Sequence, residues 1–262
     1  MDLGLKGKVI IVTGGARGIG GGISKALAAE GAIAAIVGRD ENDNLVMVKA
    51  IEATGGRAFQ TVAELTIPAQ CEQAVAAIIK EFGRIDGLVN NAGVNDGIGL
   101  ENGSYEGFMA SLHKNVVHYY LMAQHALPEL KKSKGAIVNI TSKVADTGQG
   151  NTSAYAAANG ARNALTREWA VELLKYGIRV NAVAVAECWT PLYENWIKNL
   201  PNPVEKRAEI EAKIPFENRM TTCEEIANGV VFLLSERSSH TTGQLVHIDG
   251  GYVHLDRALA GT

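Results

Sequence analysis

The sequence has little of what marks a membrane-bound, secreted or nucleic-acid-binding protein. No apolar run approaches the roughly 20 residues that a helix needs to span a bilayer, and lysine and arginine form no cluster. The formal net charge is −3 over 262 residues, which disfavours nucleic acid and anionic membrane surfaces as partners. The first residues lead directly into an apolar strand pattern without signal-peptide features. We expect no nucleic-acid partner and no membrane partner.

Cysteine is also scarce. The three cysteines, Cys71, Cys188 and Cys223, are widely separated in the sequence. Their spacing fits neither a metal site nor an even set of disulfides. We therefore expect no metal site and a reducing cytoplasmic environment.

Short apolar segments and longer segments of helical period alternate along the chain. The predicted strands cover 8–13, 33–38, 57–62, 85–90, 135–141, 178–184 and 243–249, and the predicted helices cover 18–30, 41–54, 68–82, 105–131, 153–176 and 222–235. Such alternation is typical of a parallel sheet with right-handed crossovers. The sequence predicts one α/β domain over residues 1–262, with a doubly wound, Rossmann-type, parallel seven-stranded sheet.

One insertion interrupts this alternation. Residues 187–220 have no clear period and contain Trp189, Tyr193, Trp196 and four of the six prolines. The insertion follows the carboxyl end of a predicted strand, where α/β proteins place their ligands. We expect it to form an irregular lid over a substrate.

A glycine-rich turn joins the first strand to the first helix. The stretch TGGARGIG (13–20) places glycines at 14, 18 and 20. Glycines there allow a tight turn and close approach of the backbone to a pyrophosphate at the helix N-terminus. The spacing differs from G-x-G-x-x-G, and glycines alone could serve a purely structural turn. Their place between strand and helix favours a dinucleotide site.

Further motifs along the whole chain resemble those of short-chain dehydrogenases/reductases. They are NNAG (90–93), Asn115 within a long helix, Ser142 in NITS, Tyr155 in the next helix and TTGQLVHIDGG (241–251). The stretches NNAGVNDGIGL and ECWTPLYENWI are similar to those of bacterial sugar dehydrogenases that oxidise L-fucose and related sugars. The resemblance implies an NAD(P)-dependent oxidoreductase that acts on an L-fucose-like aldose.

The resemblance also implies roles for four catalytic positions: Asn115, Ser142, Tyr155 and Asn159. Tyr155 would exchange a proton with the substrate hydroxyl, Ser142 would stabilise the developing oxyanion, and Asn115 would hold a water of a proton relay. The family carries a lysine four residues after the tyrosine. Here that position is Asn159.

Asn159 differs from the family lysine in its charge. A free tyrosine has a pKa near ~10, and the family lysine favours its charged form. Asn159 can donate a hydrogen bond to the nicotinamide ribose but carries no charge, so acid–base assistance of about 10²–10⁴-fold is at risk. Lys143 could supply a charge, although a solvated loop lysine is the favoured interpretation.

Cofactor contacts follow from the same resemblance. The expected residues are Gly14, Arg17, Gly18, Ile19, Gly20, Arg39, Glu64, Leu65, Asn91, Ala92 and Gly93, together with Tyr155 and Asn159. Arg39 and Arg17 lie where the family contacts the ribose 2′-phosphate, which favours NADP over NAD. Asp40 would favour NAD if the register differed by one residue.

Polar and aromatic residues of several loops are candidate substrate contacts. They are Asn95, Asp96, Ser142, Gln149, Asn151, Glu187, Trp189, Tyr193 and Trp196. Carboxylates, amides and flat rings suit the hydroxyl edges and CH faces of a sugar. Each residue alone could equally be an ordinary polar loop residue, and Trp196 could pack within the lid.

The resemblance further implies a homotetramer built on the helices 105–131 and 153–176, with His254 and Arg257 in a tail that borders a neighbouring subunit. Two alternatives remain open at this stage. One is a catalytically silent dinucleotide-binding protein on the same fold, since fold does not fix function. The other is a chain inactivated deliberately at Asn159.

Overall fold

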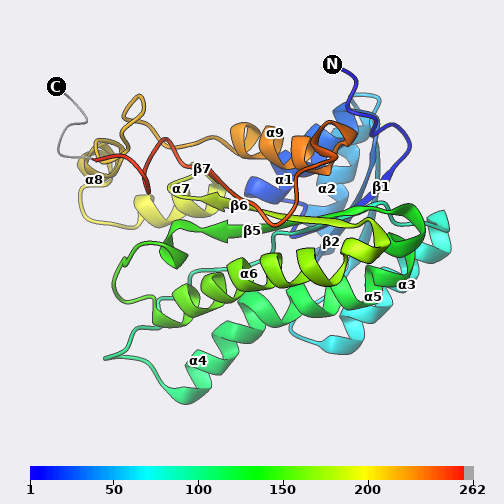
Figure 1. The fold of residues 1–262 in the computed structure, drawn as a ribbon. Helices are drawn as coiled ribbons and strands as arrows, with labels where there is room; N and C mark the ends of the chain where they lie inside the picture. The colour runs from blue at the N-terminus through cyan, green and yellow to red at the C-terminus, as the bar shows by residue number, and fades with distance from the viewer. Residues whose placement is uncertain (257–262) are drawn as a thin grey trace.

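The computed structural model describes residues 1–256, and their strands form one parallel sheet (Figure 1). The strands are β1 (Val9–Thr13), β2 (Ile33–Gly38), β3 (Arg57–Val62), β4 (Gly87–Asn90), β5 (Ala136–Ser142), β6 (Arg179–Val185) and β7 (Leu245–Ile248). Their order is β3-β2-β1-β4-β5-β6-β7, and every neighbouring pair is parallel. The predicted seven-stranded, doubly wound sheet is confirmed.

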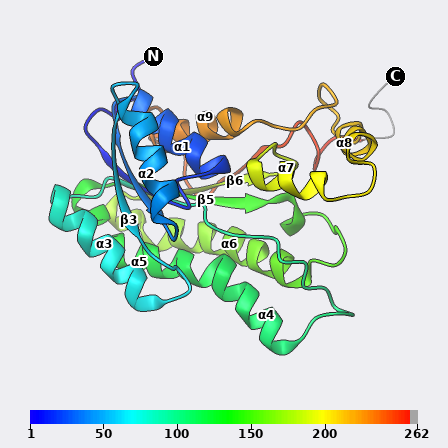
Figure 2. The same ribbon diagram turned by 180° about the vertical axis from the view of Figure 1, so that it is seen from behind.

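Helices cover both faces of this sheet (Figures 1 and 2). On one face lie α1 (Gly18–Ala29), α2 (Glu41–Glu52) and α9 (Cys223–Leu234), and on the other lie α3 (Pro68–Phe82), α4 (Tyr105–Leu112), α5 (His118–Ser133) and α6 (Ser153–Glu172). Because both faces are covered, β1, β4 and β5 are buried along their whole length. This accounts for their continuous apolar sequences.

The predicted long helix 105–131 is interrupted. A π-helical turn, η1 (His113–Val117), separates α4 from α5 and contains the fully buried Asn115. A π turn accommodates an extra residue within a helix and frequently marks a functional site. Asn115 thus lies at an irregular point of an otherwise regular helix.

The prediction that residues 187–220 are irregular is wrong. They contain α7 (Pro191–Lys198) and α8 (Pro203–Glu211), each with a proline in its first turn. Proline is favoured there because its missing N–H would have no partner in any case. The Thr190 hydroxyl caps α7 by accepting a hydrogen bond from the Tyr193 N–H at 3.1 Å.

The order of the strands predicts a crevice at the carboxyl ends of the central strands β1 and β4. The sheet grows outwards in both directions from the neighbours β1 and β4, and crevices form at the carboxyl ends of strands at such a switch point. The helices α7 and α8 lie at this end of the molecule (Figure 1).

None of the helices within residues 1–256 combines the length and apolarity needed to cross a bilayer. Arg257, in the predicted subunit-contacting tail, lies outside the described residues.

Candidate active site

A cleft of about 960 Å³ opens at the carboxyl ends of the central strands. Its lining includes Gly14, Arg17, Gly18, Ile19, Gly20, Arg39, Glu64, Leu65, Asn91, Ala92, Gly93, Asp96 and Tyr155. The fold therefore brings together residues that are up to 141 positions apart, from Gly14 to Tyr155. Every residue expected to contact a cofactor lines the cleft except Asn159.

The glycine turn forms a cradle that larger residues would fill. Gly14 and Gly18 have φ angles of 63° and 54°, a region that side chains other than glycine seldom adopt. A Cβ on Gly20 would lie 2.1 Å from the carbonyl oxygen of Gly14. The N-terminus of α1 opens at this turn, so unpaired backbone N–H groups and the positive helix end favour an anion there. The cradle fits a dinucleotide pyrophosphate.

Two charged residues, Arg39 and Asp40, follow β2 directly. Arg39 follows directly on Gly38, is exposed and lines the cleft. The Asp40 carboxylate accepts a hydrogen bond from the Asp43 N–H at 3.0 Å and so caps α2. Arg17 forms an ion pair with Asp43 across the turn. Arg39 and Asp40 therefore both line the cleft, and Asp40 also serves as the cap of α2.

Glu64 lines the same cleft. Its carboxylate accepts hydrogen bonds from the N–H and the hydroxyl of Thr66, at 3.0 and 2.9 Å. Burial raises the pKa of Glu64, but the hydrogen bonds from Thr66 outweigh this and leave the pKa below its ordinary value. Glu64 therefore stays charged near neutral pH.

Asn115 connects the π turn to the loop after β4. Its amide oxygen accepts a hydrogen bond from the Val94 N–H at 2.8 Å, and its amide nitrogen donates to the Ser111 hydroxyl at 3.3 Å. The Ser111 hydroxyl in turn donates to Asp96 at 2.8 Å. The predicted residues Asn115 and Asp96 thus belong to one hydrogen-bonded chain.

Asn159 lies behind the cleft. It is fully buried, its amide nitrogen donates to the Tyr155 carbonyl oxygen at 2.8 Å, and its amide oxygen accepts from Arg162 at 3.0 Å. The side chain is short and bonds back to its own helix, as asparagine commonly does. The amide nitrogen and the amide oxygen of Asn159, which we expected to face a nicotinamide ribose, therefore each bond to a residue of α6 instead.

Arg162 is the principal residue that the sequence analysis missed. It is 2% exposed, lines the cleft and projects from α6 into the region between Tyr155 and the π turn. Its guanidinium donates to the carbonyl oxygens of Asn115 and Ile140 at 2.6 and 3.2 Å, and to the amide oxygens of Asn159 and Asn115 at 3.0 and 3.4 Å. None of these acceptors is a carboxylate.

The guanidinium also lies over two aromatic rings. Its central carbon is 4.3 Å from the ring centre of Tyr119 and 6.0 Å from that of Tyr155. A Cβ on Gly93 would lie 2.7 Å from a terminal nitrogen of Arg162, so glycine is required there for the guanidinium to fit. The available sequence signal was spacing: Arg162 follows Tyr155 by seven residues and so shares its helix face.

Lys143 is buried, and the interpretation of it as a solvated loop lysine is wrong. It follows β5 in the short helix η2 (Lys143–Ala145), is 6% exposed and forms an ion pair with Glu187. Glu187 also accepts a hydrogen bond from the Tyr193 hydroxyl at 2.7 Å. Burial and the Glu187 charge raise the pKa of Tyr193. The lysine is buried because the insertion supplies it with a carboxylate.

The aromatic residues of the insertion form a group of their own. The ring centres of Trp189 and Tyr193 are 6.4 Å apart, and those of Tyr193 and Trp196 are 5.3 Å apart. Trp189 stacks under the Arg207 guanidinium at 4.0 Å, whereas Trp196 is 48% exposed. The Arg207 guanidinium thus covers one face of Trp189. About half of the Trp196 side chain stays accessible to solvent.

The remaining predicted substrate residues lie in two adjacent loops. Asn95, Gln149 and Asn151 are exposed, and a hydrogen bond of 3.2 Å from the Ala154 N–H to the Ile98 carbonyl joins the two loops. Ser142 ends β5 and is 8% exposed. These side chains come from segments about 50 residues apart that only the fold brings together.

Comparison with known proteins identifies the family. A family model described as enoyl-(acyl carrier protein) reductase matches residues 14–253. The L-fucose dehydrogenase of Bos taurus is 35% identical over 246 residues, which cover 94% of this chain and 89% of that protein. The levodione reductase of Leifsonia aquatica is 37% identical over 256 residues, with 93% of each chain covered. The chain belongs to the short-chain dehydrogenase/reductase family.

Solved structures agree with this assignment. The crystal structure of Cj0485 dehydrogenase is 47% identical with a TM-score of 0.95, and the match covers 100% of both chains. The aldohexose dehydrogenase of Thermoplasma acidophilum is 29% identical with a TM-score of 0.88, over 98% of each chain. The protein is an NAD(P)-dependent short-chain dehydrogenase, and the resemblance read from its sequence motifs is confirmed.

Proposed function

We propose that this short-chain dehydrogenase oxidises a hydroxyl group of an L-fucose-like aldose. The observation that carries the proposal is the Glu187 carboxylate, held by Lys143 and Tyr193 in the insertion that also borders the Tyr155 cleft. A fixed carboxylate can accept hydrogen bonds from sugar hydroxyls, and the half-exposed Trp196 offers a flat apolar ring. The names of two relatives, an L-fucose dehydrogenase and an aldohexose dehydrogenase, support a sugar.

The insertion 187–220 serves in this proposal as the substrate lid. Its helix α7 contributes Pro191, Leu192 and Asn195 to the cleft, and the capping residue Thr190 also lines it. The sugar would lie between this helix and the two loops that carry Asn95, Asp96, Gln149 and Asn151, with Glu187, Trp189, Tyr193 and Trp196 on the lid side. Ser142 would contact the reacting oxygen from the end of β5.

Tyr155 is the proposed proton acceptor in the oxidation. A bound NAD(P)⁺ supplies the acceptor for the hydride that leaves the carbinol carbon. Tyr155 takes the hydroxyl proton as the carbonyl forms, and Ser142 donates a hydrogen bond to the substrate oxygen. Asn115 stabilises the loop that carries Val94 and Asp96 through the hydrogen-bonded chain described above.

The charge that assists Tyr155 is not supplied from position 159. Asn159 is neutral, and its amide groups bond to Tyr155 and Arg162. If no cation assisted Tyr155, oxidation at neutral pH would be slower than in relatives that have a lysine at the position of Asn159, by up to about 10²–10⁴-fold. The proposed activity therefore depends on another charged group.

NADP is the proposed preferred cofactor, with NAD as the alternative. Arg39 is exposed beside the cleft, and Asp40 is engaged as the cap of α2. A guanidinium suits the ribose 2′-phosphate of NADP because it donates paired, charge-assisted hydrogen bonds.

We also propose a cytoplasmic homotetramer. Exposed apolar side chains lie on the helices expected at the interface, such as Tyr120 of α5 (50% exposed) and Val171 of α6 (67% exposed). The cysteines Cys188 and Cys223 are free thiols 4.0 Å apart, which suits a reducing compartment. Light scattering measures the oligomeric state, and a monomer would contradict the proposed assembly.

The test is an absorbance assay of nicotinamide reduction against a panel of aldoses with both cofactors. The proposal expects oxidation of L-fucose or a stereochemically close aldose, and loss of the activity in Tyr155→Phe. Calorimetric binding of a dinucleotide without turnover of any sugar would instead indicate a silent binding protein.

A further inference from the structure

We propose that Arg162 supplies the positive charge that assists Tyr155, in place of the family lysine at position 159. The inference rests on the proposed function, since it concerns the same proton transfer. Arg162 acts through Tyr155 rather than on the substrate, so it is a positioning residue. Four features of the structure support it.

The first feature is that the guanidinium is buried without a compensating carboxylate. Arg162 is 2% exposed, and its hydrogen bonds all go to neutral carbonyl and amide oxygens. A buried charge is costly unless it is paired. These bonds satisfy its N–H groups but leave its net charge in place, so a phenolate at Tyr155 would be stabilised by it.

The second feature is its position. Arg162 lies on the same face of α6 as Tyr155, and its central carbon is 6.0 Å from the centre of the Tyr155 ring. A positive charge near the ring of a tyrosine favours the ionised form of its hydroxyl. Exclusion of water by bound ligands would strengthen this interaction, because the local dielectric constant falls.

The third feature is that neighbouring ionisable groups contribute little net charge near neutral pH. His118 of α5 is uncharged there because burial and Arg162 lower its pKa to about 4. Burial raises the pKa of Tyr119, whose hydroxyl donates to the Ile140 carbonyl. The cations of the neighbouring segments are paired: Lys114 with Asp96 at 3.6 Å, and Lys143 with Glu187. The carboxylate of Glu64 acts on His118 and forms its own hydrogen bonds with Thr66.

The fourth feature is the relation between Asn159 and Arg162. The Asn159 amide oxygen accepts a hydrogen bond from the Arg162 guanidinium at 3.0 Å. A lysine at position 159 would place a second cation against this buried guanidinium. A neutral acceptor at position 159 therefore suits an arginine at position 162, and the proposed charge lies three positions further along the same helix.

The test compares Arg162→Gln, which keeps hydrogen-bond donors and loses the charge, with Arg162→Lys, which keeps the charge. Ionisation of Tyr155 is followed by NMR of protein carrying ¹³C-labelled tyrosine, with Tyr155→Phe to assign the signal. We expect Tyr155 to ionise at higher pH in Arg162→Gln than in the parent, and in Arg162→Lys to ionise closer to the parent than in Arg162→Gln. An unchanged midpoint in Arg162→Gln would overturn the proposal.

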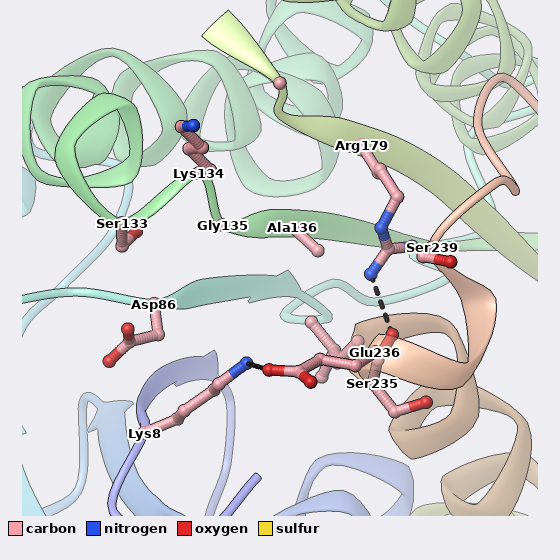
Figure 3. A pocket seen from close by; sticks show the side chains of 12 residues that line it. Lys8, Asp86, Ser133, Lys134, Gly135, Ala136, Arg179, Ser235, Glu236 and Ser239 are labelled. Carbon is pink, nitrogen blue, oxygen red and sulfur yellow. Dashed lines mark hydrogen bonds and ion pairs between the residues drawn. The ribbon is translucent and has the colours of Figure 1, made fainter. Parts of the chain in front are cut away.

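Arg179→Gln is the matched control. Arg179 also donates to backbone carbonyl oxygens, those of Leu233 and Ser235 at 2.7 and 3.1 Å. It lies at the opposite end of the sheet, beside a cavity of about 260 Å³ (Figure 3). Arg179→Gln should lower the melting temperature without moving the Tyr155 midpoint. A shift of equal size in this control would show that the effect is general loosening of the fold and would overturn the proposal.

Kinetics provide a second readout. In Arg162→Gln the rise of kcat for sugar oxidation should move to higher pH by the same amount as the Tyr155 midpoint, with the KM for the dinucleotide unchanged. The NMR titration needs no turnover, so a protein without sugar oxidation would contradict the proposed function while leaving the role of Arg162 testable.

If Arg162→Gln does not fold, the double variant Asn159→Lys with Arg162→Leu replaces it. In that double variant Tyr155 should ionise at the same pH as in the parent. Ionisation a full pH unit higher would contradict the proposal that a cation at either position assists Tyr155.

Discussion

The amide oxygen of Asn159 lies 3.0 Å from a terminal nitrogen of the Arg162 guanidinium, from which it accepts a hydrogen bond. Both side chains are buried. A neutral acceptor at position 159 is thus part of how the protein accommodates a buried arginine beside Tyr155.

Asn159→Lys alone should destabilise the protein. The new ammonium would be buried beside the guanidinium, and an uncompensated buried charge costs roughly 3–5 kcal/mol. Denaturant unfolding measures the change. The double variant with Arg162→Leu should recover most of the lost stability, because it leaves one cation in the region. Equal stabilities of Asn159→Lys and the parent would show that the two positions do not interact as the structure indicates.

Gly93→Ala should impair both stability and oxidation. The added methyl group would lie 2.7 Å from an Arg162 nitrogen and 2.9 Å from the Asn115 amide oxygen. Overpacking of this kind costs typically about 1–3 kcal/mol. Gly160→Ala is the control, because nothing lies within 4 Å of its added methyl in α6. It should stabilise the protein by about 0.5–1 kcal/mol. Thermal melts and kcat of both variants check the contrast.

Arg39→Asp should shift cofactor preference from NADP towards NAD. The change removes the cation that we propose for the 2′-phosphate and adds an acceptor for a 2′-hydroxyl. A charged hydrogen bond is worth about 1.5–3 kcal/mol, so the ratio of kcat/KM for NADP to that for NAD should fall at least ~10-fold. Arg39→Leu separates loss of the phosphate contact from gain of the acceptor. An unchanged ratio in Arg39→Asp would mean that another residue reads the 2′ position.

His118 should make the protein less stable in mild acid. Its pKa is lowered from 6.5 to about 4, mainly by burial. Between these values the unfolded chain binds a proton that the folded chain does not, so stability is full above pH 6.5 and falls as the pH drops towards 4. The difference corresponds to about 3 kcal/mol. Unfolding free energies between pH 4 and 7 should show a smaller slope in His118→Gln than in the parent, and no change of slope in the exposed-site control His240→Gln.

The sequence was sufficient for the fold and for many of the residues that line the cleft. Apolar periodicity predicts the strands and helices, and local motifs such as the glycine turn and NNAG lie on consecutive residues. The position of Arg39 also follows from local order, since it is the first residue after β2. These features depend on neighbours in the chain, which a sequence pattern can represent.

The sequence was not sufficient where function depends on contacts between distant segments. Arg162 bonds to Asn115, 47 residues away, and Lys143 pairs with Glu187, 44 residues away. Neither burial could be predicted from spacing, because each partner lies on a different element. The insertion 187–220 was predicted to be irregular because proline usually interrupts a helix. Here prolines stand in the first turns of α7 and α8, where they are compatible with a helix.

The most direct test of the proposed function follows the hydride itself. The enzyme is incubated with NADP⁺ or NAD⁺ and L-fucose deuterated at all of its carbon positions, and the recovered nicotinamide is analysed by mass spectrometry. The account predicts one deuterium in the reduced cofactor, and none when Tyr155→Phe replaces the parent. Reduced cofactor without deuterium, or no reduced cofactor from L-fucose and related deuterated aldoses, would contradict it.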